Sequence, residues 1–432
     1  MNKPRRPIRN PSSSSINGFF SVPKLPVSKP EPNEAPVKTS PLVKKDLRPS
    51  QSTRNINLSL SKNSLSRSTI VMSPLLLSGP ISNEIAKESC SNMLTAYEMK
   101  EIENFPEIFY LGEMSTKIHP RANIPISNVF DDSSHHLKAV PSSHLAYRYE
   151  VQSVIGKGAF SQVLRCFDHK TKEYVAVKIL INTDEVKEQG NFELSILKHL
   201  NSSPDSEFNC ISHCLDSFEF RNHICIVFDV LGSNLYEFHK SIKFRPFVSK
   251  QLQAIATQVL TALAFCHSHN VVHCDIKPEN IVFSGDSYLM CELIDFGSSC
   301  FIGQERFEYV QSRFYRAPEV ILGCRYGPPI DIWSFACVLV ELSTGKALFP
   351  GQTEEDMISL MAEALGTPPK SLTDSGKRKI QITQKQNKTS AYEILMKNPD
   401  TQMVDLILKC LEWVPSNRIS AEDALKHPWL SC

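Results

Sequence analysis

The chain has 432 residues, enough for two or three domain-sized units, and its 41% hydrophobic and 22% charged residues are ordinary for a globular protein. A formal net charge of +1 excludes a protein that is strongly basic or acidic as a whole. The charge is nevertheless uneven. Of the 47 basic and 46 acidic residues, residues 1–80 hold 13 and 3, so the remainder holds 34 and 43. The sequence thus describes a basic tail joined to a mildly acidic body.

The first 84 residues are predicted to be a disordered tail. Residues 1–80 contain 16 Ser and 12 Pro with few aromatics, and this composition cannot bury enough apolar surface to offset the entropy of ordering. Ser-Pro sites for phosphorylation and a nuclear-import signal at Arg5, Arg6 and Arg9 are open interpretations, and a solvated linker accounts for the same residues without either function. Only Phe19 and Phe20 are interleaved with the basic residues, which argues against a nucleic-acid binder.

No segment is expected to span a membrane, because the most apolar run, Ile70 to Ile81, is short and interrupted by two prolines. The 13 cysteines lack a paired Cys-x-x-Cys framework, which suits reduced thiols inside the cell. Cys210, His213 and Cys214 suggest a metal site, but no second ligand pair lies at zinc-finger spacing. We expect a cytoplasmic protein, with the nucleus as an open alternative.

Residues 85–148 differ in composition from the tail. Apolar residues recur at helical intervals between Met93 and Phe105, and an aromatic run from Ile108 to Leu111 follows Pro106. This region is too small for a core of its own, so we expect it to pack on the neighbouring domain through its aromatic residues.

From Tyr149 the pattern predicts a strand, a glycine-rich loop and a second strand. Gly156 and Gly158 let main-chain amides approach anionic phosphates, and Val163 with Ala176 offers small apolar walls for a flat base. A lone Gly-x-Gly also fits an ordinary hairpin. The residues assigned to nucleotide binding here are Ile155, Gly156, Lys157, Gly158, Ala159, Phe160, Ser161, Gln162, Val163 and Ala176.

Lys178, on the strand after this hairpin, can pair with the α- and β-phosphates of a nucleotide. Such a lysine needs a carboxylate to hold it, and Glu193 lies on a predicted helix, although three other carboxylates nearby leave a solvated glutamate as the alternative. The apolar run Ile224–Leu231 predicts a buried strand. The base pocket is then completed by Phe228, Asp229, Val230, Leu231 and, beneath the base, Val282.

The stretch Val-His-Cys-Asp-Ile-Lys-Pro-Glu-Asn ends at Asn280, fifteen residues before Asp295-Phe-Gly. A carboxylate at Asp275 can accept a hydroxyl proton, Lys277 can neutralise phosphate charge, and Asn280 with Asp295 supplies hard oxygen ligands for Mg²⁺. Each residue singly fits an ordinary loop. Together, flanked by short apolar strands, they predict an apparatus for phosphoryl transfer.

This spacing resembles the catalytic loop and DFG segment of protein kinases. Further residues resemble one branch, the dual-specificity tyrosine-regulated kinases or DYRK family: Cys274 before the catalytic aspartate, Ser298-Ser-Cys300, and Gln311-Ser-Arg-Phe-Tyr-Arg316. The resemblance covers roughly residues 93–430. Leu94–Gly112 resembles the accessory region of class II members, and Phe130–Tyr149 resembles the DYRK homology box.

The resemblance implies an α+β, two-lobed protein-kinase fold. The kinase domain is expected over residues 149–430, with an antiparallel-sheet N-lobe at 149–231 and a helical C-lobe at 232–430, after an accessory region and homology box at 85–148. It implies ATP and Mg²⁺ as cofactors, with Asp275, Lys277 and Asn280 catalytic and Asn280 and Asp295 as metal ligands. The expected partners are protein substrates modified on Ser or Thr, often before proline, and the chain is expected to be a monomer.

Tyr309 matches the second tyrosine of a Tyr-x-Tyr pair that the family autophosphorylates during maturation, and Phe307 stands at the first position. A phosphate on Tyr309 adds about −1.5 to −2 charges. Arg313 and Arg316 follow closely, so we assign them to phosphotyrosine binding.

Several polar residues near these motifs are assigned structural parts instead. His273 is expected to pack internally, Asp331 to anchor the backbone of the catalytic loop, and Glu319 to pair with Arg418 inside the helical lobe. Residues 368–390 are predicted to be a surface loop, shorter than the family's usual insert.

A rival hypothesis from another functional class is a kinase-like scaffold that binds partners without transferring phosphate. Its support in the sequence is Ser161 in place of the third glycine, Phe307, and Ala336 in place of a glycine. All catalytic side chains are present, which favours the enzyme.

Overall fold

The computed structural model describes residues 79–120, 129–204, 209–284, 289–380 and 390–430. The prediction of disorder for residues 1–78 therefore lies outside the described residues. The predicted tail boundary after residue 84 is wrong by a few residues, because a helix begins at Asn83. The Ser82 hydroxyl caps that helix by accepting a hydrogen bond of 3.3 Å from the Ile85 amide.

The described residues form short and long strands and a series of helices. The strands are β1 (Ile81–Ser82), β2 (Glu107–Ile108), β3 (His144–Leu145), β4 (Tyr149–Lys157), β5 (Ser161–Asp168), β6 (Glu173–Leu180), β7 (Asp216–Phe220), β8 (His223–Asp229), β9 (Val271–Val272), β10 (Ile281–Phe283), β11 (Cys291–Leu293) and β12 (Cys300–Phe301). The helices are α1 (Asn83–Ser89), α2 (Glu98–Glu101), α4 (Asp184–Asn201), α5 (Leu235–Ser241), α6 (Ser249–Ser268), α7 (Pro318–Ile321), α8 (Pro329–Thr344), α9 (Glu354–Leu365), α10 (Lys370–Ser375), α11 (Ser390–Met396), α12 (Thr401–Cys410) and α13 (Ala421–Leu425).

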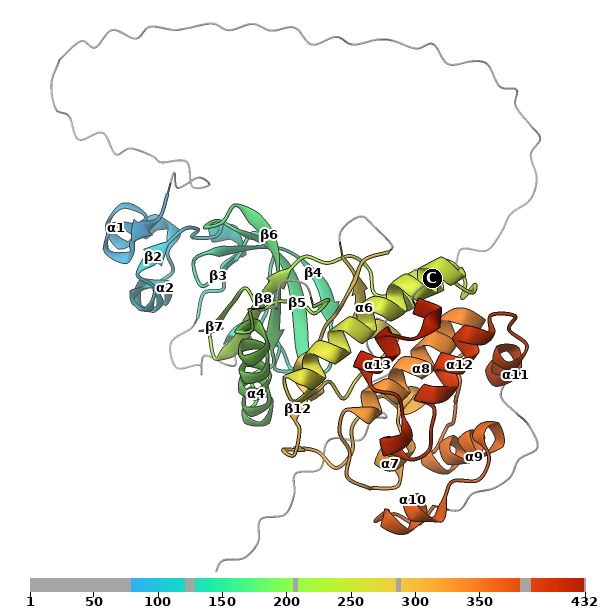
Figure 1. The fold of residues 1–432 in the computed structure, drawn as a ribbon. Coiled ribbons are helices and arrows are strands. Elements are labelled where there is room, and N and C mark those ends of the chain that lie inside the picture. The colour runs from blue at the N-terminus through green and yellow to red at the C-terminus, as the bar shows by residue number, and fades with distance from the viewer. Residues whose placement is uncertain (1–78, 121–128, 205–208, 285–288, 381–389, 431–432) are drawn as a thin grey trace, which may run out of the picture. The chain divides into compact units, whose positions relative to one another are not determined.

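Six strands form one antiparallel sheet in the order β3-β4-β5-β6-β8-β7 (Figure 1). Buried and exposed residues alternate along β5, the pattern of a strand with one covered face. Val151, Leu164, Val177 and Val227 belong to the apolar cluster on that face. The predicted antiparallel N-lobe is therefore confirmed.

The 18-residue helix α4 packs against strands β6 and β8 of this sheet. The Thr183 hydroxyl caps its first turn by accepting from the Val186 amide. Its buried face carries Ile196 and Leu197 and also the carboxylate of Glu193, which points an acidic group toward the sheet. The prediction of a helix over Phe192–Leu200 is confirmed.

The chain from residue 232 onward is mainly helical, and we call residues 232–430 the helical lobe. Helix α8 is apolar on nearly all sides and almost every residue in it is buried, as expected for a helix at the centre of a core. Beside it, Arg418 donates two hydrogen bonds to Glu319, at 2.6 and 2.7 Å, with both side chains inaccessible to solvent. The predicted ion pair inside the lobe is thus confirmed.

The accessory region, residues 79–120, packs on the sheet through aromatic rings, as predicted. The Phe105 ring lies 5.1 Å from that of Tyr147 and 6.3 Å from that of Phe220 at the end of β7. Glu101 accepts hydrogen bonds of 2.8 and 2.9 Å from Arg221, in the turn after β7. Apolar contact and a bidentate ion pair therefore attach the region at the same place.

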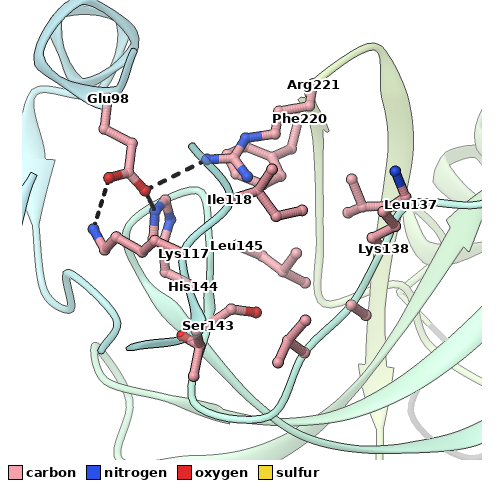
Figure 2. Close-up of a pocket in the computed structure, with 13 residues that line it drawn as sticks. Glu98, Lys117, Ile118, Leu137, Lys138, Ser143, His144, Leu145, Phe220 and Arg221 are labelled. Carbon is pink, nitrogen blue, oxygen red and sulfur yellow. Dashed lines mark hydrogen bonds and ion pairs between the residues drawn. The ribbon is translucent and has the colours of Figure 1, made fainter. Parts of the chain in front are cut away.

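Glu98 is the centre of a buried charge cluster at this attachment (Figure 2). Its carboxylate binds Lys117 at 2.8 Å and the His144 ring at 2.9 Å, and lies 3.6 Å from the Arg221 guanidinium. Burial opposes the charge of Glu98, but the hydrogen bond from His144 and the charge of Lys117 hold the pKa of this carboxyl well below its ordinary 4.5. The cavity beside the cluster, about 20 Å³, has room for one water molecule and excludes a nucleotide.

None of the helices within the described ranges is both long enough and apolar enough to cross a lipid bilayer.

Replacing Glu98 with glutamine should destabilise the protein by about 3–5 kcal/mol, because the buried Lys117 would lose its carboxylate partner while Arg221 would keep Glu101. Since the folded-state pKa of Glu98 is lowered, the difference from wild type should be complete above pH 4.5 and shrink as the pH falls below it. Urea unfolding followed by circular dichroism measures the effect. Tryptophan fluorescence would not report on the accessory region directly, since all three tryptophans lie in the helical lobe.

The matched control is Glu103→Gln, which breaks an exposed pair with Lys87 in the same region and should change stability little. Equal effects of the two substitutions would contradict the role given to the buried cluster.

Candidate active site

The backbone between β9 and β10 is held in place by a buried carboxylate on α8. The amides of His273 and Cys274 each donate a 2.9 Å hydrogen bond to Asp331, which is fully buried. Cys274 itself has a positive φ of 66°, a conformation that costs a non-glycine residue energy. Asp331 offsets that cost and anchors the loop, as the sequence predicted.

His273 has the packing role that we expected. Its ring is buried against Phe296 at a centroid distance of 5.1 Å, and its two nitrogens contact the Ile294 carbonyl and the Asp275 amide. Both ring nitrogens are thus occupied by main chain. His273 orients the loop and is not placed to take a proton from a substrate.

Asp275 is surrounded by donors that fix both of its carboxylate oxygens. Lys277 Nζ lies 2.6 Å from Oδ2, and the Ser312 hydroxyl donates to Oδ1 at 2.8 Å. The Asn280 amide donates to the Asp275 carbonyl at 2.8 Å and lies 3.2 Å from Oδ2. Burial opposes the charge of Lys277, but the charge of Asp275 outweighs it, so the pKa of this lysine is raised.

Lys178 joins the sheet to the segment that carries Asp295. Its ammonium lies 2.6 Å from Glu193 Oε1 and 2.8 Å from Asp295 Oδ1. Burial opposes the charge on all three groups. The two carboxylates nevertheless raise the pKa of Lys178, and Lys178 in turn lowers the pKa of Asp295. The choice of Glu193 over its neighbours in the sequence is therefore correct.

Asn280 and Asp295 fit the metal site that the sequence predicts. Asn280 uses its amide nitrogen within the loop, so its oxygen is the atom left to coordinate a cation. The side chain of Asp295 is 40% exposed and its backbone has a positive φ of 65°. Within the described ranges no cluster of three acidic, histidine or cysteine side chains could hold a metal alone, so a cation here would need phosphate oxygens or water as further ligands.

The residues assigned to the base pocket lie on neighbouring strands. Ala176 is the cross-strand partner of Phe228, and Val163 is the partner of Lys178. Ala176 and Val282 are nearly buried, whereas Ile155, Phe160 and Val230 are exposed apolar residues. The segment after β8 is tied to β10, because the Gly232 amide donates to the Phe283 carbonyl at 2.8 Å.

Two side chains of the hairpin between β4 and β5 bind the segment Asp131–Leu137 of the homology box. Lys157 Nζ pairs with Asp132 at 2.8 Å, and the buried Gln162 donates to the Leu137 carbonyl at 2.6 Å. The His136 ring also lies 2.8 Å from the Gly158 carbonyl. The sequence predicted the hairpin but not its contacts with the homology box, since the residues in contact are more than twenty positions apart.

Tyr309 lies beside arginines, but only one of the two predicted residues is among its described contacts. Arg316 donates to the Tyr309 hydroxyl and stacks 3.7 Å from its ring centroid, whereas Arg313 donates to the Gln352 carbonyl at 2.7 Å. The second guanidinium over the ring is that of Arg378, at 5.1 Å. Sequence reasoning missed Arg378, because it lies 69 residues away in a segment predicted to be a surface loop.

Comparison with known proteins gives a consistent result. Residues 149–430 match the family model described as "Protein kinase domain". Over 384 residues the chain is 40% identical to dual specificity tyrosine-phosphorylation-regulated kinase 3 of mouse and of Macaca fascicularis, covering 82% of this chain and 66% and 68% of those relatives. It is 39% identical over 355 residues to serine/threonine-protein kinase ppk5 of Schizosaccharomyces pombe, covering 78% of this chain and 42% of that relative. The chain thus spans about two thirds of the length of the first two.

Replacing Lys178 with methionine should make the stability of the protein depend on pH. Glu193 and Asp295 would then face each other without a cation, and one of them would keep its proton above its ordinary pKa. Because the folded state would bind more protons than the unfolded state, stability should fall as the pH rises, by up to about 1.4 kcal/mol per pH unit. Thermal unfolding between pH 5 and 8 measures this.

Lys198→Met, which removes an exposed lysine from the same helix as Glu193, is the control and should follow the wild-type profile. A Lys178→Met profile parallel to wild type would show that the two carboxylates are not coupled through Lys178.

Proposed function

Because this chain belongs to the protein kinases, and within them to the dual-specificity tyrosine-phosphorylation-regulated kinases, we propose that it transfers the γ-phosphate of ATP to serine and threonine hydroxyls of protein substrates. The observation that carries this proposal is the fixed carboxylate of Asp275, flanked by the cation of Lys277 and by the Lys178–Glu193–Asp295 bridge. Phosphoryl transfer needs positioning and charge stabilisation, and these residues supply both.

The catalytic residues divide the work by charge. Asp275 orients the substrate hydroxyl and accepts its proton, while Lys277, held 2.6 Å away, neutralises charge on the transferred group. Lys178 binds the α- and β-phosphates from the sheet side, and Glu193 keeps it extended toward them.

We propose Mg²⁺ as the divalent cation, held by the oxygens of Asp295 and Asn280 together with phosphate oxygens. When bound, it supplies positive charge that shields the phosphates from the approaching hydroxyl. Two hard oxygen ligands from the protein, without nitrogen or sulfur, suit this ion better than a transition metal.

A preference for proline after the phosphorylated residue follows from the backbone beside Asp275. Gln311 has a positive φ of 68°, and its carbonyl accepts a 2.6 Å hydrogen bond from Arg316. We propose that this carbonyl, which is occupied by Arg316, does not accept a hydrogen bond from a substrate chain bound beside Asp275 and Ser312. Proline lacks an N–H, so it loses no hydrogen bond there, whereas any other residue would leave its N–H without this acceptor.

We further propose that the enzyme autophosphorylates Tyr309 in cis during maturation. The contact of its hydroxyl with Arg316 supports this, because a phosphate would replace the neutral acceptor of this hydrogen bond by an anionic one and so form an ion pair. Phe307 cannot be modified at the neighbouring position, which leaves a single tyrosine in this pair.

We propose that the chain acts as a monomer in the cytoplasm, with the nucleus as an open alternative. All cysteines in the described residues are free thiols, which supports a reducing compartment.

Asp275→Asn should lower phosphate transfer to a generic basic protein by at least about 10²-fold, because the proton-accepting carboxylate is lost. It should also abolish the phosphate on Tyr309 in protein made in bacteria. Radiolabel incorporation and mass spectrometry measure the two effects.

The variant's thermal unfolding midpoint provides the folding control, since asparagine keeps an acceptor for the Ser312 hydroxyl. Transfer that does not depend on Asp275 in folded protein would favour the scaffold hypothesis over the enzyme.

Peptides that differ only in the residue after the serine test the predicted preference for proline. We expect kcat/KM to be about tenfold higher for Ser-Pro than for Ser-Ala, which corresponds to one unpaired N–H in the complex. Steady-state kinetics with matched peptides gives the ratio. Equal values would mean that the orientation of the Gln311 carbonyl does not select the substrate.

A further inference from the structure

We propose that Arg378, on the segment that follows α10 in the helical lobe, is part of the binding site for a phosphate on Tyr309, together with Arg316. This inference rests on the proposed autophosphorylation of Tyr309. Arg378 lies outside the activation segment, residues 295–319, which carries Tyr309.

Two guanidinium groups lie over the same tyrosine ring. The Cζ atom of Arg316 is 3.7 Å from the ring centroid and that of Arg378 is 5.1 Å from it. Arg316 is almost completely buried, whereas Arg378 is about one third exposed. A phosphate on the partly exposed Tyr309 would therefore meet one rigid arginine and one that can adjust its side chain.

The position of Arg378 is determined by close contact between two backbones. The Arg378 amide donates a 3.0 Å hydrogen bond to the Leu322 carbonyl. Gly376 lies where a Cβ atom would come within 2.7 Å of that carbonyl, and Gly323, with φ +71°, lies where a Cβ would touch the Arg378 side chain at 3.3 Å. Both glycines let the segment approach the end of α7, so the arginine is held beside Tyr309 by its main chain.

Glu354 holds the two arginines in the unmodified protein. Its carboxylate lies 3.6 Å from Arg316 and 3.3 Å from Arg378, at the first turn of α9. Arg316 and Arg378 carry one positive charge more than Glu354 neutralises, so the surroundings of the tyrosine ring are positively charged. This charge suits a phosphate that brings about −1.5 to −2, and the phosphate can take over hydrogen bonds that Glu354 makes only at long distance.

A phosphate on Tyr309 that binds both Arg316 and Arg378 would therefore link the activation segment to residues 376–378. These residues are already bound to the end of α7 by the hydrogen bond from the Arg378 amide to the Leu322 carbonyl. The short insert of this chain would then take part in holding the substrate platform.

The test is the rate at which a tyrosine phosphatase removes the phosphate from Tyr309 in the full chain, followed by mass spectrometry. Arg378→Ala should be dephosphorylated about tenfold faster than wild type, as expected for the loss of one charge-assisted contact. Arg378→Lys, which keeps the charge but loses the forked donors, should fall between the two and also serves if the alanine variant does not fold.

The matched control is Lys377→Ala, which removes the same charge one residue away. Lys377 is exposed and pairs with Glu308 at 3.1 Å, so the rate should stay within about twofold of wild type.

A second measurement separates stability from phosphate binding. Arg378→Ala should lower the thermal unfolding midpoint of the phosphorylated protein by about 2–4 °C more than it does in the Tyr309→Phe background.

Equal dephosphorylation rates for Arg378→Ala and Lys377→Ala would overturn this inference alone, as would equal midpoint shifts in the two backgrounds. Absence of phosphate on Tyr309 in the wild-type protein would instead overturn the autophosphorylation on which it rests.

Discussion

The bridge from Lys178 to Glu193 and Asp295 is the interaction on which the site depends, because it connects three parts of the chain that are far apart in sequence. A sheet strand, helix α4 and the segment after β11 each contribute one charged group. Without Lys178 the two carboxylates would face each other, and Glu193 would be a buried charge without a cation, which would be costly. Their mutual dependence places a lysine for phosphate binding and a carboxylate for cation binding within one hydrogen-bond length.

Strained backbone around the site is stabilised by buried side chains that take no part in chemistry. Cys274 and Gln311 both have positive φ angles, and each is held by hydrogen bonds from or to a buried charged residue, Asp331 for the first and Arg316 for the second. The positive φ at Cys274 sets the direction of the loop that carries Asp275, and the positive φ at Gln311 places its carbonyl on Arg316, as the proposed proline preference requires. Arg316 thereby serves two proposed functions, substrate selection and binding of the phosphate on Tyr309.

The homology box binds the site's hairpin from outside the kinase domain, and the accessory region attaches to the sheet beside its edge strand β7. The box binds the glycine-rich hairpin through Lys157 and Gln162, and the Glu98 cluster attaches the accessory region to the sheet near Arg221. The glycine-rich hairpin of the proposed nucleotide site is therefore bound by a segment that precedes the kinase domain. The match to the mouse relative covers 82% of this chain, so it includes residues outside the kinase domain at 149–430.

From the sequence alone we predicted the glycine-rich hairpin, the helix that carries Glu193 and the pairing of Glu193 with Lys178, because these depend on periodicity and on offsets within short motifs. Their spacing also predicted that Asp275, Asn280 and Asp295 share one site. Only the tertiary structure decided which groups meet across long separations: it brought Arg378 to Tyr309 in addition to Arg316, and turned the side chain of Lys157 toward Asp132. Such contacts depend on how the backbone of one segment packs against another, and local residue patterns contain no record of that packing.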